Sequence, residues 1–144
     1  MVGNAGDGGL SGAGTGTGSG PKEDAFAEYL GVEVTRLGQG HTAALLRTAA
    51  PHANPHGTVH GAVFYAVAGA AVAAAANDAA NSGIITSVLV EYLRPAAIGD
   101  ELFAEVERQA STGREDIFTG TVRRGARGEL LAWVRARGTR RPRA

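Results

Sequence analysis

The first regular spacing of hydrophobic residues predicts a short helix near the start of the chain. Phe26, Tyr29 and Leu30 recur at helical intervals. Gly31 follows them, and glycine readily takes the left-handed conformation in which helices commonly end. We therefore expect a helix over residues 23–30.

A hairpin is predicted next. Residues 32–36 and 41–48 have the composition of strands, and the glycines of the segment 38–40 suit the turn between them. A loop containing Pro51 and Pro55 follows. Proline disfavours helix in the residue before it, so the chain is expected to leave the hairpin as irregular structure.

Residues 59–80 form the longest apolar segment. Apolar residues occupy nearly the whole circumference of the helix it would form, which is typical of a buried helix. Small residues such as Ala66, Gly69 and Ala73 would let a sheet approach it closely. The segment is too short and too rich in alanine for a membrane span.

The remainder of the chain predicts consecutive strands. In the segment 101–109, Leu102, Ala104 and Val106 alternate with polar residues and fall on one face. An antiparallel sheet wrapped around one buried helix accommodates both this pattern and the apolar helix, so we predict an α+β fold. The other strands are expected over residues 84–93, 117–124 and 129–139.

Length, charge and composition narrow the class of protein. The 144 residues suffice for one domain, which we place over 22–144 behind a flexible glycine-rich leader at 1–21. The 14 acidic and 14 basic residues cancel, so we expect binding neither to nucleic acid nor to a membrane. The basic segment 135–143 is expected to be solvated. The sequence contains no cysteine and no recognisable signal peptide, which favours a cytoplasmic protein.

The densest group of polar residues is the segment 51–61, directly before the predicted long helix. His52, His56 and His60 are spaced by four, which on a helix would align them as metal ligands. Pro55 disfavours a helix there, so we predict neither a metal site nor a cofactor.

The start of the long helix suggests a different chemistry. Unpaired N–H groups and the positive end of the helix dipole would stabilise the oxyanion formed when a thioester carbonyl is attacked. Gly61 would let the carbonyl approach the backbone, while Asn54 and His60 would orient the thioester or a water. The residues alone equally support a structural role, in which Asn54 and His60 cap the helix and hold the loop.

Two stretches resemble a known family. Residues 54–68 (NPHGTVHGAVFYAVA) are similar to the signature of PaaI-type hotdog thioesterases, in which an Asn, a Gly and a His-Gly-Gly open the central helix. Residues 90–100 (VEYLRPAAIGD) resemble the strand and turn of the same family. The likeness covers residues 23–138. It implies a hotdog fold, an acyl-CoA thioester substrate, and a homodimer or homotetramer.

The resemblance also implies roles for single residues. The Gly61 amide would line an oxyanion hole, with Asn54 and His60 facing the thioester and Gly57 in the same substrate-binding loop. Thr86 or Ser87 would place a hydroxyl near the attacking water, although both residues equally suit an ordinary strand.

One position departs from the family pattern. Nine residues after His60 the family usually has an aspartate that activates water or attacks the acyl carbon, and here that position is Gly69. Asp78 would lie about 13 Å further along the helix, which leaves Glu91 as a candidate base. We therefore expect acyl-CoA hydrolysis or, alternatively, acyl-CoA binding with weak or no turnover. Hydration of an enoyl-CoA is less favoured, because the Asp/His pair for it is not evident.

Overall fold

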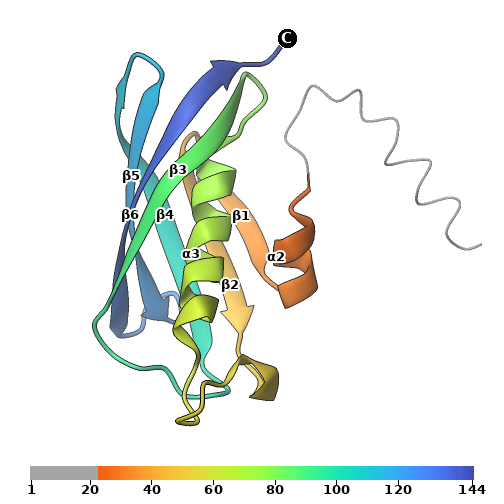
Figure 1. Cartoon of the computed structure of the whole chain (residues 1–144), viewed down its shortest axis with the longest axis vertical. Helices are drawn as coiled ribbons and strands as arrows, with labels where there is room; N and C mark the ends of the chain where they lie inside the picture. The colour runs from red at the N-terminus through yellow and green to blue at the C-terminus, as the bar shows by residue number, and fades with distance from the viewer. Residues whose placement is uncertain (1–22) are drawn as a thin grey trace, which may run out of the picture.

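The computed structural model describes residues 23–144, so the predicted leader at 1–21 lies outside the described residues. The chain forms one long helix packed against a curved sheet (Figure 1). In chain order the elements are α2 (Ala25–Leu30), β1 (Glu33–Gly38), β2 (His41–Arg47), η1 (Ala50–His52), α3 (Gly61–Ala76), β3 (Asn81–Tyr92), β4 (Glu101–Thr112), β5 (Glu115–Arg124) and β6 (Leu130–Pro142).

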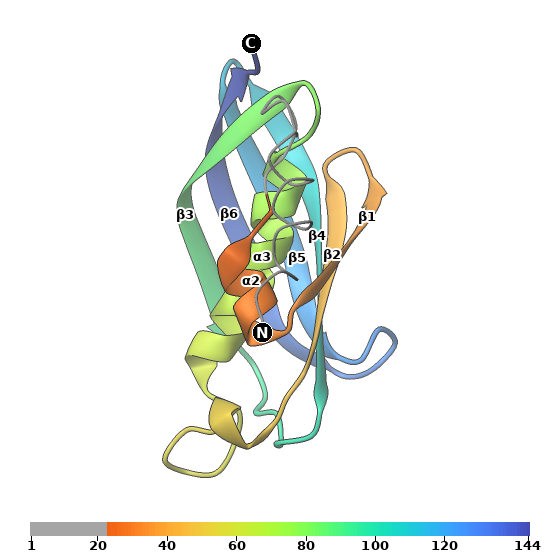
Figure 2. The same cartoon turned by 90° about the vertical axis from the view of Figure 1, so that its right-hand side faces the viewer.

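The six strands form a single antiparallel sheet in the order β1-β2-β4-β5-β6-β3. Strands β1 and β3 are its two edges. The sheet wraps around α3, and α2 lies beside α3 (Figure 2). The predicted architecture, a long helix wrapped by an antiparallel sheet, is confirmed.

The long helix begins two residues later than the predicted 59–80. It starts at Gly61 because the side chain of His60 caps it: Nδ1 of His60 accepts a hydrogen bond from the backbone N–H of Ala62 at 3.0 Å. A side-chain acceptor at this position pairs one of the N–H groups that a helix start leaves free.

The helix also ends earlier than predicted, at Ala76. Asn77 has an extended backbone, and the Asp78 carboxylate accepts hydrogen bonds from the N–H groups of Ala80 and Asn81 at 2.9 and 2.6 Å. This side-chain turn competes with continued helix, so the apolar residues after it belong to the turn. Strand β3 consequently begins at Asn81 rather than at the predicted residue 84.

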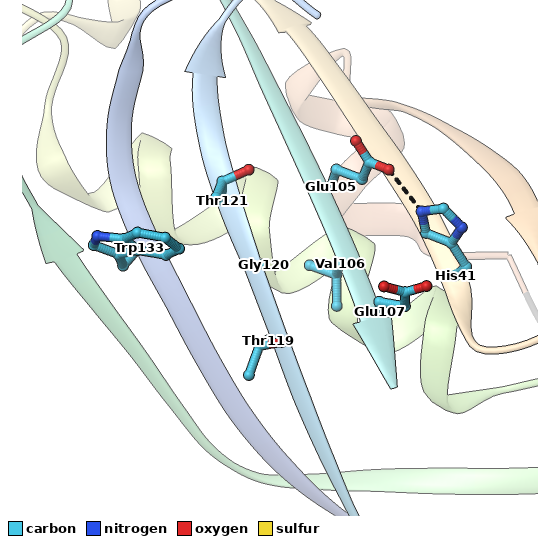
Figure 3. Close-up of a pocket in the computed structure, with 8 residues that line it drawn as sticks. All are labelled: His41, Glu105, Val106, Glu107, Thr119, Gly120, Thr121 and Trp133. Atoms are coloured by element: carbon cyan, nitrogen blue, oxygen red, sulfur yellow. Dashed lines mark hydrogen bonds and ion pairs between the residues drawn. The ribbon is translucent and has the colours of Figure 1, made fainter. Parts of the chain in front are cut away.

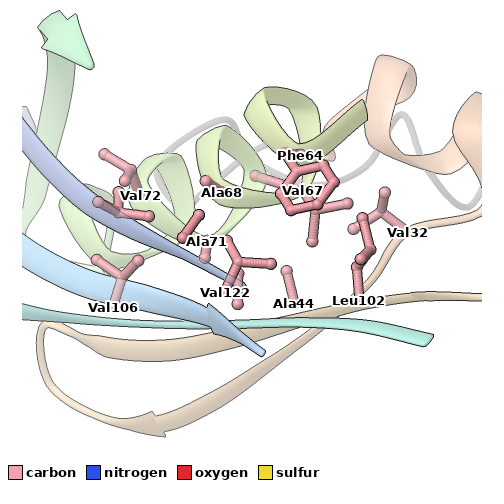
Figure 4. Close-up of a cluster of buried hydrophobic side chains, with 14 of the residues drawn as sticks. Val32, Ala44, Phe64, Val67, Ala68, Ala71, Val72, Leu102, Val106 and Val122 are labelled. Carbon is pink, nitrogen blue, oxygen red and sulfur yellow. The ribbon is translucent and has the colours of Figure 1, made fainter. Parts of the chain in front are cut away.

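The core lies between α3 and the concave face of the sheet (Figure 4). Leu102, Ala104 and Val106 are 0% exposed, which confirms the face predicted from their alternation. A buried polar contact joins the layers, because Thr42 Oγ1 donates to the carbonyl of Ala71 at 2.6 Å. Other large side chains in this layer are Val67, Val72, Phe118, Val122 and Leu131.

A glycine allows the closest approach between β3 and the helix. A Cβ at Gly83 would lie 2.5 Å from the carbonyl oxygen of Ala76 and 2.7 Å from its Cβ. No side chain fits at those distances, so small residues at both positions are what bring the strand against the helix end. This close approach is at Ala76 and not at the helix residues from which it was expected: at Gly69 a Cβ would meet no atom within 4 Å.

One face of α2 and one face of α3 are partly exposed to solvent. In α2 only Ala27 is buried, while Phe26 and Tyr29 are 62% and 83% exposed, so the helical spacing predicted the helix but not its packing face. In α3 the side chain of Tyr65 is 48% exposed, and Gly69 on the next turn is half-buried. No helix within residues 23–144 is long and apolar enough to cross a membrane.

Candidate functional site

The loop before α3 is organised by the side chain of Asn54. Its Oδ1 accepts hydrogen bonds from the N–H groups of His56 (2.9 Å) and Thr58 (3.1 Å), and its Nδ2 donates to Thr58 Oγ1 at 2.8 Å. The backbones of Asn54 and Thr58 are also paired, at 2.8 Å. Asn54 therefore closes a tight turn that delivers the chain to the start of α3.

Gly57 occupies that turn because of its backbone conformation. Its φ is +87°, and its N–H donates to the carbonyl of Asn54 at 3.0 Å. A Cβ there would meet no atom within 4 Å, so the left-handed conformation, rather than space, requires glycine.

His60 lies at the junction of the loop and the helix. Its N–H donates to the carbonyl of His52 at 2.8 Å, and its Nδ1 accepts from Ala62 as described above. In a neutral imidazole, an acceptor at Nδ1 leaves the proton on Nε2. The exposed ring of His60 therefore caps the helix with one nitrogen and has an N–H donor on the other.

Gly61 is the first residue of α3, and its N–H has no acceptor among residues 23–144. The phenol of Tyr92 lies against this residue and donates to its carbonyl at 2.7 Å. A Cβ at position 61 would lie 3.2 Å from the Tyr92 ring, so glycine admits this close contact. Burial raises the pKa of the Tyr92 phenol above its ordinary value, so the hydroxyl remains a donor at neutral pH.

Asn54, Gly61 and Tyr92 border a cleft of about 360 Å³. Phe64 and Tyr92 form an edge-to-face pair on one side, with ring centroids 5.5 Å apart. Among residues 23–144, Arg94 is the one cation that lines the cleft, and no acidic residue of this part of the chain lines it. The Nε of Arg94 lies 3.1 Å from a carboxylate oxygen of Glu129. The lining residues are Asn54, Thr58, Val59, Gly61, Phe64, Tyr92, Leu93, Arg94 and Pro95.

The structure thus brings Asn54 and Gly61 together at one cleft, with His60 and Gly57 on the adjoining loop. Gly69 does not reach that cleft within one chain. It follows Gly61 by eight residues, about 12 Å along the helix axis. A Cβ at Gly69 would meet no atom within 4 Å, so this position opens onto unoccupied space.

Thr86 and Ser87 lie on β3, outside the cleft. The register between β3 and β6 shifts between Ile85 and Ser87, which makes Thr86 the extra residue of a bulge, and its hydroxyl donates to the carbonyl of Arg137 at 3.3 Å. Ser87 is directly opposite Arg137 in the ladder. Both residues are exposed in the single chain.

The alternative carboxylates are also remote from the cleft. Glu91 pairs in register with Trp133, whose side chain is half exposed on the face of the sheet opposite α3. Cross-strand neighbours share a face, so Glu91 points away from α3. Asp78 is at the other end of the helix, where hydrogen bonds from the N–H groups of Asn81 and Ala80 and the charge of Arg108 lower its pKa despite the opposing effect of desolvation.

No three His, Asp or Glu side chains within residues 23–144 gather closely enough to hold a metal ion. His52 Nδ1 instead accepts from the N–H of Ala49 at 2.9 Å. The residues between His52 and His60 form a loop rather than a helix, so their spacing by four gives them no common face.

Tyr92 and Arg94 are site residues that the sequence did not single out. Both belong to the stretch 90–100, whose resemblance to the family's strand and turn is the sequence feature that could have identified them. The contact of Tyr92 with Gly61, about thirty residues earlier in the chain, depends on how β3 folds back along α3, and Arg94 follows two residues later in the lining of the same cleft.

Known proteins resemble this chain in sequence and in fold. The sequence model of the thioesterase superfamily matches residues 56–114. Comparison with curated proteins gives no match.

Solved structures with the same fold include PaaI proteins. That of Escherichia coli, from the phenylacetic acid degradation operon, has 21% identity and a TM-score of 0.78, over 85% of this chain and 88% of the other. A mutant of PaaI from Thermus thermophilus has 28% identity and a TM-score of 0.74, over 81% and 98%. A thioesterase of Haemophilus influenzae has 18% identity and a TM-score of 0.72, over 81% and 82%. At 21% and 18% identity the first and third support the hotdog fold alone. The chain thus has the hotdog fold, and the superfamily match together with these structures is consistent with its resemblance to PaaI-type hotdog thioesterases.

Proposed function

We propose that the protein hydrolyses an acyl-CoA or aryl-acyl-CoA thioester by attack of water on the thioester carbonyl. The observation that carries the proposal is the N–H of Gly61, which has no acceptor among the described residues and borders the cleft at the start of α3. The helix dipole adds a positive partial charge of about half an elementary charge at this end. An oxyanion formed there would gain both a hydrogen bond and a favourable field.

The neighbouring loop supports a role for two further residues. Asn54 uses both of its side-chain polar atoms within the loop, so in this proposal it fixes the approach to Gly61. His60 has its Nε2–H free of the helix cap, and that donor is suited to orient the thioester or a water. Gly57 contributes the turn that keeps the loop compact.

The proposed active site needs a second copy of the chain. The separation of about 12 Å between Gly61 and Gly69 prevents the two positions from serving one carbonyl within a chain. Strand β3 is an edge of the sheet, with Ile84 and Leu89 55% and 53% exposed, and pairing of this edge with a second copy would bury both. We propose a homodimer through this edge, or a tetramer built from it, in which position 69 and the hydroxyls of Thr86 and Ser87 approach the other copy's cleft.

A second candidate function is acyl-CoA binding with weak or no turnover. The observation that favours it is the chemistry of the cleft, which has an oxyanion donor but no carboxylate among its lining residues. Without a general base, bound thioester would be polarised but attacked slowly. A screen of thiol release over aliphatic and aryl acyl-CoAs, with binding measured in parallel, separates the two functions: turnover supports hydrolysis, and tight binding without turnover supports the alternative.

A matched pair of variants tests the Gly61 amide directly. Gly61→Ala and Gly61→Pro both place a Cβ near Tyr92, but only proline removes the N–H. Proline is well tolerated at the first helical position, and the extended backbone of His60 is compatible with a following proline. We expect kcat of the proline variant to fall about 100-fold to 1,000-fold below that of the alanine variant. Equal kcat values in two folded variants would exclude the amide as the oxyanion donor.

A further inference from the structure

Tyr92 is the last residue of β3, and the alternation of the strand turns its side chain toward α3. Its neighbour Glu91 is opposite Trp133 in the ladder, and Trp133 borders a trough on the other face of the sheet (Figure 3). Successive side chains of a strand point to opposite faces, so Tyr92 points to the helix side. There its hydroxyl donates to the carbonyl of Gly61 at 2.7 Å. Tyr92 therefore ties the end of an edge strand to the first residue of α3.

The two peptide groups that flank Gly61 are held to different extents. In the peptide after it, the N–H of Ala62 donates to Nδ1 of His60 at 3.0 Å, and the carbonyl of Gly61 accepts from Tyr92. In the peptide before it, the carbonyl of His60 accepts from the N–H of Val63 at 2.9 Å, whereas the N–H of Gly61 has no acceptor among residues 23–144. The peptide after Gly61 is thus held at both ends, and the peptide before it at its carbonyl alone.

Glycine makes this junction sensitive to such contacts. Because Gly61 has no Cβ, its φ and ψ are less restricted than those of other residues, and rotation of the preceding peptide would swing the N–H away from the cleft. The ring of Tyr92 lies against the same residue, 3.2 Å from where a Cβ would be. One side chain therefore contacts Gly61 both at its carbonyl and beside its Cα, and it restricts the rotation that the missing Cβ permits.

The ring of Tyr92 is itself held in place. It packs edge to face against Phe64, with ring centroids 5.5 Å apart, and Phe64 is 2% exposed. The backbone just beyond it is fixed to β6, because the N–H of Leu93 donates to the carbonyl of Leu131 at 2.8 Å. The hydroxyl thus reaches Gly61 from the sheet and the core rather than from the loop before α3.

We propose that Tyr92 is a positioning residue, which keeps the Gly61 N–H directed into the cleft through its hydrogen bond to the Gly61 carbonyl. This inference rests on the proposed hydrolysis at Gly61. In this role the hydroxyl acts through the amide rather than on the thioester, so its loss affects the reaction of bound substrate more than substrate binding. A purely structural tie between β3 and α3 would instead affect stability and leave kcat unchanged in the folded protein.

Tyr92→Phe removes the hydroxyl and keeps the ring. We expect kcat to fall about 10-fold to 100-fold, since a catalytic group misplaced by about 1 Å can lose about 100-fold in rate, while KM changes less than about twofold. In a Gly61→Pro background, which has no N–H to position, the same substitution should change kcat less than about twofold. An unchanged kcat in Tyr92→Phe, or an equal fall in both backgrounds, would overturn the proposal.

Tyr29→Phe is the matched control. It removes the hydroxyl of a residue on α2 that is 83% exposed, and it should have the kcat and KM of the wild type. Thermal unfolding establishes that each variant is folded.

The order of the Gly61 amide tests the same inference without any turnover. Backbone relaxation measured by NMR should give Gly61 an order parameter near the rigid value of about 0.85 in the wild type and below about 0.6 in Tyr92→Phe, with Ala71 in the middle of α3 rigid in both. A protein that hydrolyses no acyl-CoA in the screen would contradict the proposed function, and this measurement would still decide the role of Tyr92. If the Gly61 amide of the folded variant stays as ordered as in the wild type, the positioning role is refuted.

Discussion

Installing a carboxylate at position 69 should accelerate thioester hydrolysis. Gly69→Asp introduces the group that the cleft lacks, at a position where a Cβ meets no atom within 4 Å. Aspartate has a helix propensity a few tenths of a kcal/mol better than glycine, so the variant should unfold at nearly the wild-type temperature. Because the position is half-buried in the single chain, the charge is not forced into a dry core.

The expected gain follows from general-base or nucleophilic assistance, which is worth about 100-fold to 10,000-fold. That factor corresponds to a barrier lower by roughly 3 to 5 kcal/mol. Position 69 lies about 12 Å from Gly61 of its own chain, so the gain requires the cleft of a second copy. We therefore expect the acceleration to disappear when the protein is diluted below its assembly concentration, while the slow wild-type rate changes less.

The assay is thiol release on the best acyl-CoA found in the screen. Gly69→Asn supplies a side chain of the same size without the carboxylate, and it should remain as slow as the wild type. The rate of the aspartate variant should fall in acid, as protonation removes the base near the ordinary pKa of about 4. A fast wild type that Gly69→Asp slows would refute the missing-base account, as would equal rates for the aspartate and asparagine variants.

The remaining predictions concern the loop, the cleft and the leader. Asn54→Ala removes three hydrogen bonds and should destabilise the fold by about 1 to 3 kcal/mol, whereas His60→Ala removes one helix cap, worth about 1 kcal/mol. Both variants should also lower turnover or thioester binding. If thermal unfolding shows that they are folded and kinetics shows full activity, capping is the only role of these residues. Arg94→Ala should raise KM roughly tenfold for an acyl-CoA, because the cation is placed to contact the phosphates of CoA. The KM for the same acyl group on N-acetylcysteamine, which lacks those phosphates, should not change. Equal effects on both substrates would rule out a phosphate contact. Deletion of residues 1–21 should change neither the melting temperature nor turnover, and a drop of several degrees would show that the leader packs on the domain.

Alternation and periodicity predicted the fold because burial follows them closely. Leu102, Ala104 and Val106 are fully buried, as expected for the inner face of a strand around a helix. The ends of α3 were predicted less well, because single side chains decide them. His60 and Asp78 bind nearby backbone N–H groups and so interrupt a segment whose apolar residues continue beyond the helix.

The site was predictable only in part for a related reason. Asn54, Gly57, His60 and Gly61 are neighbours in sequence, so one motif was enough to propose them together. Tyr92 reaches Gly61 only through the packing of β3 along α3, which no local pattern reveals. The space beside Gly69 is likewise a property of the folded chain, since the sequence shows a missing carboxylate but not whether one would fit.

The spatial distribution of charged residues is a further property that depends on the fold. The acidic and basic residues balance, and the neutral total indicated no electrostatic partner. The ladder nevertheless sorts side chains by strand, so acidic residues of β4 and arginines of β6 stand on either side of the uncharged Thr119 and Thr121. A neutral total predicts no long-range attraction to a polyanion, whereas charges sorted by strand would act on a partner only at contact distance. Net charge therefore predicts the long-range behaviour of the chain, but it does not describe the local charge that a partner would meet on one face of the sheet.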